Sequence, residues 1–137
     1  MACNVFINFN GNCRDALEFY TQVFKLSAPK IMTYGEAHGP KDSTPTADIG
    51  RVLYATLPIA GGNMMFSDCP SDFHHVTGNN FAVTLRYNKN DILDVKRIFA
   101  ELCCGGKIAM PLEPTFFSEL FGMVTDKFGV TWQLSVE

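Results

Sequence analysis

This 137-residue sequence lacks several features that mark particular classes of protein. It has no run of basic residues: the 11 Lys and Arg are scattered and the net charge is −3, so we expect no nucleic-acid partner. It also has no long apolar helix. The longest uncharged stretches, such as residues 52–67, contain Pro58 and Gly61 and alternate as strands do, so we expect no membrane partner.

The cysteines lack the spacing of a metal or redox motif. There are five of them, an odd number, and no two form a CxxC pair, which favours reduced thiols and a cytoplasmic location. Residues 1–9 lack the positively charged segment that opens a signal peptide and run directly into a predicted strand. We therefore expect no cleavable signal.

Glycine-rich phosphate loops and activated nucleophiles are missing too. No GxGxxG is present, and the glycines at positions 11, 61–62 and 105–106 all fit turns. A chain with no glycine loop after a parallel strand has no ordinary place for S-adenosylmethionine. The sequence has no Ser, His and Asp in the order of a catalytic triad and no activated cysteine with a nearby histidine. It therefore gives no support for acyl transfer.

What the sequence does contain is an internal repeat. Residues 6–24 align with residues 81–99 at a constant offset of 75 positions and without a gap. Apolar residues coincide where a packed helix needs them, for example Tyr20 with Val95. Two similar modules predict an internal pseudo-twofold axis, and the cleft between such modules is the expected ligand site.

The repeat predicts module one at residues 1–68, a linker at 69–79 and module two at 80–137. Neither half is long enough to bury a good core alone, so we expect one domain. Asn12 is placed to cap the first helix, with Asp15 in the position of a capping box.

Each module is predicted to run βαβββ. The predicted strands are residues 4–9, 30–34, 51–59 and 63–68, then 80–87, 107–112, 116–125 and 130–136; the predicted helices are 13–24 and 91–104. The fold class is therefore α+β. We expect a curved, mostly antiparallel sheet around a central cavity, with the helices on its convex side.

Three segments carry a resemblance to a known family. They are FNGNCRDALEFY at residues 9–20, MMFSD at 64–68 and FGMVTDKFGVTW at 121–132. Together with the order of elements, they resemble the PhnB-like branch of the vicinal oxygen chelate superfamily, which includes glyoxalases, extradiol dioxygenases and bleomycin-resistance proteins. The resemblance covers essentially the whole chain.

The resemblance implies a divalent metal on the concave face, held by the first and last strands of each module. The ligands are usually His, Glu or Gln. Here the first-strand position falls at Val5 or Ile7 in module one and at Asn80 or Ala82 in module two. None of these side chains is a usual ligand.

The last-strand positions also depart from the family pattern. Aligning Gly61 with Gly129 places Met65 and Gln133 where enzymes of the superfamily usually carry Glu. Only Gln133 has a suitable oxygen, and one amide oxygen cannot hold a catalytic ion. We therefore expect no metal cofactor. Consecutive strand residues alternate, so Trp132 is predicted to pack under a helix while Thr131 and Gln133 face the cavity.

Two charged residues are further candidates for the cavity. Glu119 lies in a predicted apolar strand, where a carboxylate either faces water or serves as an acid or base. Arg86 shares the alternation of Thr84 and could neutralise an anionic ligand or pair with a carboxylate. The predicted cavity residues are Ile7, Met65, Thr84, Arg86, Glu119 and Gln133.

The histidines allow alternative interpretations. His74 and His75, beside Asp72, could bind zinc, although a solvated linker is the simpler reading. His38 lies in the polar loop at residues 37–47 and could cover a cleft, or be an exposed loop residue.

The function predicted from the sequence is binding of a small organic molecule by a homodimer without the usual metal. In bleomycin-resistance proteins, the analogy within the superfamily, dimerisation forms the ligand clefts. The alternatives are a metal-dependent lyase or dioxygenase, with ligands from Gln133, Glu119 and a loop histidine, or an interaction module that dimerises through sheet edges.

Overall fold

The computed structural model describes residues 1–38 and 44–137. The chain divides into two compact units, Met1–Val76 and Thr77–Glu137, and the boundary falls within the predicted linker. The side chain of His38 and residues 39–43 of the predicted polar loop lie outside the described residues.

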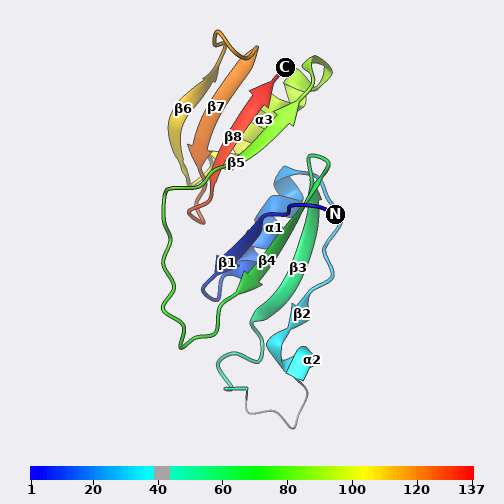
Figure 1. The fold of residues 1–137 in the computed structure, drawn as a ribbon, viewed down its shortest axis with the longest axis vertical. Helices are drawn as coiled ribbons and strands as arrows, with labels where there is room; N and C mark the ends of the chain where they lie inside the picture. Colours follow the sequence, from blue (N-terminus) through cyan, green and yellow to red (C-terminus); the bar gives the residue numbers. More distant parts are fainter. Residues whose placement is uncertain (39–43) are drawn as a thin grey trace. The chain divides into compact units, whose positions relative to one another are not determined.

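Unit 1 is a four-stranded mixed sheet with a helix on one face (Figure 1). Its elements are β1 (Phe6–Phe9), α1 (Cys13–Val23), β2 (Met32–Thr33), α2 (Tyr34–His38), β3 (Val52–Ile59) and β4 (Gly62–Asp68). The strand order is β1-β4-β3-β2. The first strand pairs in parallel with the last, and the other pairs are antiparallel.

Unit 2 has the same topology. Its elements are β5 (Val83–Tyr87), a 3₁₀ turn (Lys89–Asp91), α3 (Ile92–Leu102), β6 (Lys107–Glu113), β7 (Leu120–Thr125) and β8 (Thr131–Val136). The strand order is β5-β8-β7-β6, with β5 parallel to β8. The α+β class and the βαβββ order of each module are confirmed, with α2 as an addition in unit 1.

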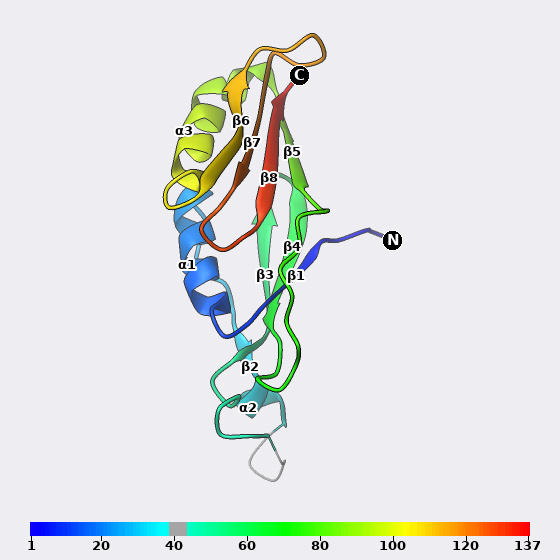
Figure 2. The same ribbon diagram turned by 90° about the vertical axis from the view of Figure 1, so that its left-hand side faces the viewer.

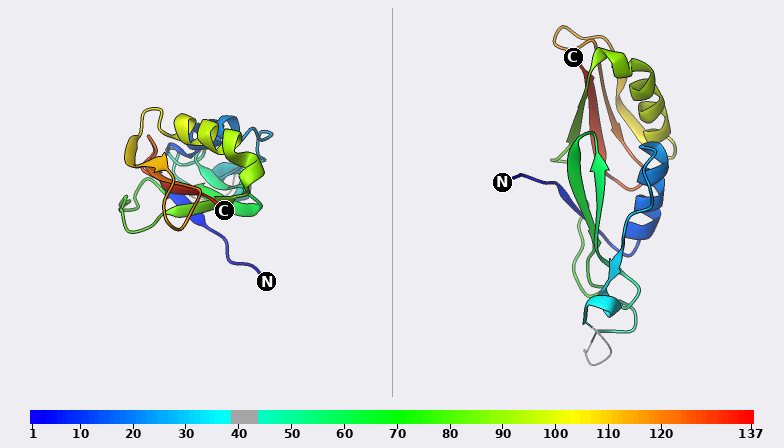
Figure 3. Two further views of the ribbon diagram at one scale, coloured as in Figure 1. Left: turned by 90° about the horizontal axis from the view of Figure 1, so that it is seen from above. Right: turned by 90° about the vertical axis from the view of Figure 1, so that its right-hand side faces the viewer.

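In each unit the long helix covers one face of its own sheet (Figures 2 and 3). The apolar side of α1 carries Ala16, Tyr20 and Val23, and that of α3 carries Val95, Phe99 and Leu102; all are buried. These residues recur three or four positions apart, so each helix presents one continuous apolar stripe to its sheet. Burying that stripe against the strands forms the core of the unit.

Several predicted strands are shorter in the structure, three of them by three residues or more. The segment 30–34 keeps only β2, because Thr33 Oγ1 accepts a hydrogen bond from the backbone N–H of Glu36 at 3.1 Å and the chain turns into α2. The segment 80–87 begins at Val83, and the segment 116–125 begins at Leu120. Local contacts of this kind set the first and last residues of an element, and hydrophobic alternation in the sequence does not reveal them.

The predicted repeat offset is wrong in its detail. Both Met65 and Gln133 follow a glycine turn with positive φ by four positions, and their partners on the first strands are Phe6 and Thr84. Phe6 and Thr84 are 78 positions apart. The two long helices begin at Cys13 and Ile92, which are 79 positions apart. The gap-free offset of 75 therefore matches neither the strands nor the helices.

Among the described residues, the helices are too short and too polar to pass through a lipid bilayer.

Candidate functional site

The sheet face of unit 2 turned away from α3 brings together three of the six predicted site residues, Thr84, Arg86 and Gln133. Along β8, Trp132, Leu134 and Val136 are buried, while Thr131 and Gln133 are half-buried. Trp132 is fully buried and α3 contacts β8, as predicted for that residue. We call the opposite side, which carries Thr84, Arg86, Phe121, Met123 and Gln133, the unit 2 face.

Thr84 and Gln133 lie directly opposite each other on parallel strands, and Met123 lies opposite Gln133 on the other side. The Thr84 hydroxyl donates a hydrogen bond to Gln133 Oε1 at 2.9 Å. The amide of Gln133 is thereby held by its oxygen. One end of this row is polar and the other presents a thioether.

Arg86 is one strand repeat further along β5, opposite Ser135 and in the same row as Phe121. Its side chain is 74% exposed, and Nε lies 3.7 Å from Oε1 of Glu137. An ion pair this exposed contributes little to stability. Arg86 therefore places a positive charge, with N–H groups that can donate to a ligand, at the end of the face.

Glu119 does not lie inside a strand. It precedes β7, its backbone N–H donates to the Val136 carbonyl at 2.9 Å, and its Oε1 lies 2.7 Å from Lys89 Nζ. Both side chains of the pair are exposed. The hydrogen bond and charge of Glu119 raise the pKa of Lys89 above its usual value. Of the two readings of this carboxylate, the structure places it in an exposed ion pair.

In unit 1, Ile7 and Met65 lie on opposite faces of the sheet. Phe6 is the strand partner of Met65, whereas Ile7 is the partner of the buried Phe66, whose ring lies 5.7 Å from that of Tyr20 in α1. Ile7 therefore shares the helix-covered side, and its prediction as a cavity residue alongside Met65 is corrected. The shift arises because strand positions alternate, so an odd error in alignment reverses the face.

The alternative first-strand positions of module two also move. Asn80 and Ala82 precede β5, and the residue opposite Gln133 is Thr84. Asn80 and Ala82 therefore have no place in the row that carries Gln133.

The linker histidines are separated by their contacts. His75 Nε2 lies 2.8 Å from the carbonyl oxygen of Asn8 in β1, and His74 is exposed. Within residues 1–38 and 44–137, no three His, Cys, Asp or Glu side chains form a group that could hold a metal ion.

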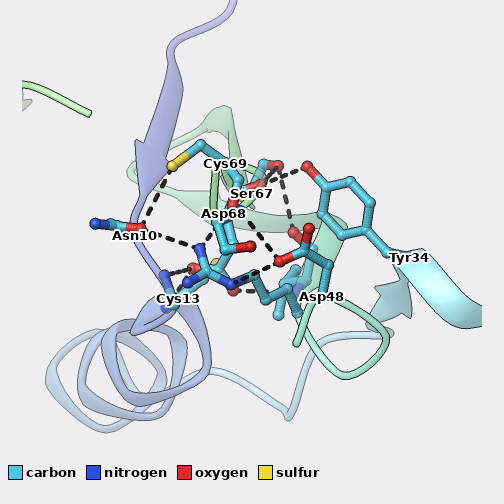
Figure 4. Close-up of polar contacts among 11 residues, drawn as sticks. Asn10, Cys13, Tyr34, Asp48, Ser67, Asp68 and Cys69 are labelled. Carbon is cyan, nitrogen blue, oxygen red and sulfur yellow. Dashed lines mark hydrogen bonds and ion pairs between the residues drawn. The ribbon is translucent and has the colours of Figure 1, made fainter. Parts of the chain in front are cut away.

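Sequence reasoning missed a buried polar cluster in unit 1 that centres on Asp68, the last residue of β4 (Figure 4). Its Oδ1 accepts hydrogen bonds from the backbone N–H of Gly11 at 2.8 Å and Cys13 at 3.0 Å, and its Oδ2 accepts from Val52 at 3.0 Å. Asn12 makes no side-chain cap. A carboxylate from a distant strand thus caps α1, where the helix dipole also favours negative charge.

Arg51 and Tyr34 complete this cluster. The Arg51 guanidinium donates to Asn10 Oδ1 at 3.0 Å and to the Cys69 carbonyl at 2.8 Å, and pairs with Asp48 at 3.4 Å. The Tyr34 hydroxyl donates to the Asp68 carbonyl at 2.7 Å. The MMFSD segment was visible in the sequence, but nothing in it indicated that its aspartate would reach the start of a helix 55 positions earlier.

The cluster also affects the pKa of the Cys13 thiol. Burial, and then the charge of Asp68, raise the pKa of Cys13 from 9.0 to about 12, with a small opposing effect from Arg14. Nucleophilic cysteines need a lowered pKa. Cys13 is therefore an inert part of the core.

Two mixed βαβββ sheets, each with its first strand parallel to its last, form the fold expected from the resemblance to the vicinal oxygen chelate superfamily. A glyoxalase-related enzyme from Fulvimarina pelagi shares this fold at 14% identity, with a TM-score of 0.56 over 100% of this chain and 89% of that one. The family model for 3-demethylubiquinone-9 3-methyltransferase matches residues 2–135, and the chain belongs to that family.

Individual relatives agree with this assignment. Protein YjdN of Escherichia coli is 32% identical over 144 residues, covering 99% of this chain and 95% of YjdN. The crystal structure of PA1353 from Pseudomonas aeruginosa has a TM-score of 0.84 at 28% identity, covering 100% and 98% of the two chains. A PhnB protein from Bacillus cereus has a TM-score of 0.76 at 28% identity, covering both chains completely. The resemblance to the PhnB-like branch is confirmed.

Proposed function

We propose that this chain binds a small organic molecule and does so without the metal usual in its superfamily. The observation that carries the proposal is the hydrogen bond from Thr84 to Gln133 Oε1 at 2.9 Å. It engages the one oxygen that could have served as a family-type ligand, and it turns the amide into a fixed polar group beside Met123. A ligand site needs a few oriented polar groups among apolar ones.

The donor set supports the same proposal. The side chains opposite one another at the family positions are Phe6 with Met65 and Thr84 with Gln133. A phenyl ring has no donor atom, and a thioether suits soft ions rather than the divalent ions that carboxylate and imidazole hold. These residues do not fit a divalent metal, so we derive no step through one.

The metal-dependent lyase or dioxygenase is less well supported. It needs Glu119 as a ligand, and that carboxylate is paired with Lys89 at 2.7 Å outside the strand. Among the described residues, the polar contacts of Glu119 are with Lys89 and the Val136 carbonyl, and none is with Gln133.

Methyl transfer, which the family's description names, has no support in the described geometry either. In the described part of unit 1, a strand, a glycine and a long helix follow one another at β1, Gly11 and α1. The N–H groups of Gly11 and Cys13 there already bind the Asp68 carboxylate. A helix start that is filled by its own protein is not open to the anionic groups of a cofactor.

We extend the proposal to a homodimer in the cytoplasm. Closed twofold symmetry is the commonest outcome of self-association. The five cysteines are all free thiols, which favours a reducing compartment. The interaction-module alternative shares the dimer and differs in needing no ligand.

The test is a thermal-shift screen of metabolites and antibiotics on protein dialysed against EDTA, with metal content measured by elemental analysis. A ligand at about 100 times its Kd should stabilise the fold by roughly 2.7 kcal/mol. The proposal expects a stabilising compound whose effect survives the chelator and weakens in Gln133→Ala. Lys96→Gln, an exposed position on α3, is the matched control. One tightly held nickel, zinc or iron per chain, with stabilisation lost in EDTA, would support the enzyme instead.

A further inference from the structure

The hydrogen-bonding capacity left on the unit 2 face is mainly that of donors. Gln133 Oε1 accepts from Thr84, so the NH₂ end of the amide is the part that can serve a ligand. The hydroxyls of Thr125 and Thr131 bond to each other at 2.9 Å. On β8, Gln133 therefore has free amide N–H donors, and a ligand that binds there should carry a hydrogen-bond acceptor.

Arg86 adds positive charge to the same face. It is two residues beyond Thr84 on β5, which is about 6.6 Å along the strand. Its guanidinium has five N–H donors in a planar fork that fits the two oxygens of a carboxylate. The nearest acidic group is Glu137, at 3.7 Å and exposed, and such a contact is weak enough for a ligand to replace.

The apolar part of the face is aromatic and soft. Phe121 is two strands from Arg86 in the same row, and Met123 is next to Gln133. The Phe121 ring meets the edge of the Phe117 ring, with centroids 5.1 Å apart. Flat rings pack well against such edge-to-face pairs and against methionine sulfur.

We propose that the ligands of this face are aromatic carboxylates. The carboxylate binds Arg86, and the ring packs on Phe121 and Met123. In a ligand that carries a further oxygen, that oxygen accepts from the Gln133 amide. This inference rests on the proposed function, because it names the class of small molecule that the metal-free site takes.

The experiment compares two probes of nearly equal shape by isothermal titration calorimetry: 2-naphthoate, which is anionic, and 2-naphthylmethanol, which is neutral. Wild-type protein is expected to bind 2-naphthoate at least tenfold more tightly. Arg86→Gln should remove that preference by weakening the binding of 2-naphthoate to about the affinity of the neutral probe. Lys96→Gln removes the same charge from the helix side of unit 2 and should leave the preference intact.

The outcomes separate the two proposals. Equal binding of both probes, unchanged in Arg86→Gln, overturns the carboxylate class and leaves small-molecule binding standing. An equal loss of preference in Lys96→Gln also overturns it, because net charge rather than Arg86 would then be responsible. No binding of either probe to folded wild-type protein overturns the carboxylate class, while the screen in EDTA judges the proposed function separately.

Discussion

The indole N–H of Trp132 donates a hydrogen bond to Oδ2 of Asp126 at 2.8 Å, and both side chains are buried. The other oxygen of Asp126 accepts from the backbone N–H of Phe128 at 2.9 Å and of Val130 at 3.0 Å. One carboxylate therefore holds the β7–β8 turn and the core tryptophan at once. This contact joins the shape of the hairpin to the packing of α3 on its sheet.

Trp132→Ala should lower the free energy of unfolding by about 3 to 5 kcal/mol, because it empties a fully buried site. Trp132→Phe should lose less, since it keeps most of the apolar volume and gives up the bond to Asp126. Urea unfolding followed by circular dichroism measures both. A melting temperature like that of wild type for Trp132→Ala would contradict the assignment of its face.

Asp68→Asn should destabilise unit 1 by about 1 to 3 kcal/mol, because both carboxylate oxygens accept buried or partly buried backbone N–H bonds and an amide has one acceptor atom. Asp15→Asn is the control: it removes the same charge from the exposed first turn of α1. Its effect should stay within about 1 kcal/mol, the size of a dipole interaction. Equal losses in the two variants would refute the capping role of Asp68.

Alkaline pH should destabilise the fold through Cys13. Its pKa is about 12 in the folded protein against an ordinary 9.0, so the folded state keeps its proton while the unfolded state loses it. Stability from this group is complete below pH 9 and falls between about pH 9 and 12, by at most about 1.4 kcal/mol per pH unit. Cys13→Ala should flatten the curve of unfolding free energy in that window. Cys3→Ala, at an exposed thiol, should not.

Light scattering at micromolar concentration should give twice the 15.2 kDa mass of one chain. A mass near 15.2 kDa would reject the homodimer. Measuring it with and without 2-naphthoate shows whether ligand and association are linked.

The order of elements was predictable from the sequence, but the correspondence between the modules was not. The helices begin 79 positions apart, and an offset of 75 differs from this by four positions, close to one helical turn, so apolar positions still coincide. It differs from the strand offset of 78 by three, and an odd error exchanges the two faces of a strand. Ile7 was misplaced for that reason.

The candidate site was predictable where alternation alone decides the face. Thr84 and Gln133 were expected on one side of the sheet, and they bond to each other. The Glu119 ion pair with Lys89 and the reach of Asp68 to Gly11 depend on where turns bring distant residues together. Local patterns carry no signal for contacts of that kind.

The parallel pairing of β1 with β4 affects the order in which the chain can fold during its synthesis. Phe6 pairs with Met65, which is 59 positions later in the chain, and the start of α1 is capped by Asp68. Contacts of such sequence separation form only after the entropy of closing a long loop has been overcome. During synthesis, α1 is thus made long before its capping carboxylate, and the N-terminal edge of the protein remains unpaired until β4 has been added.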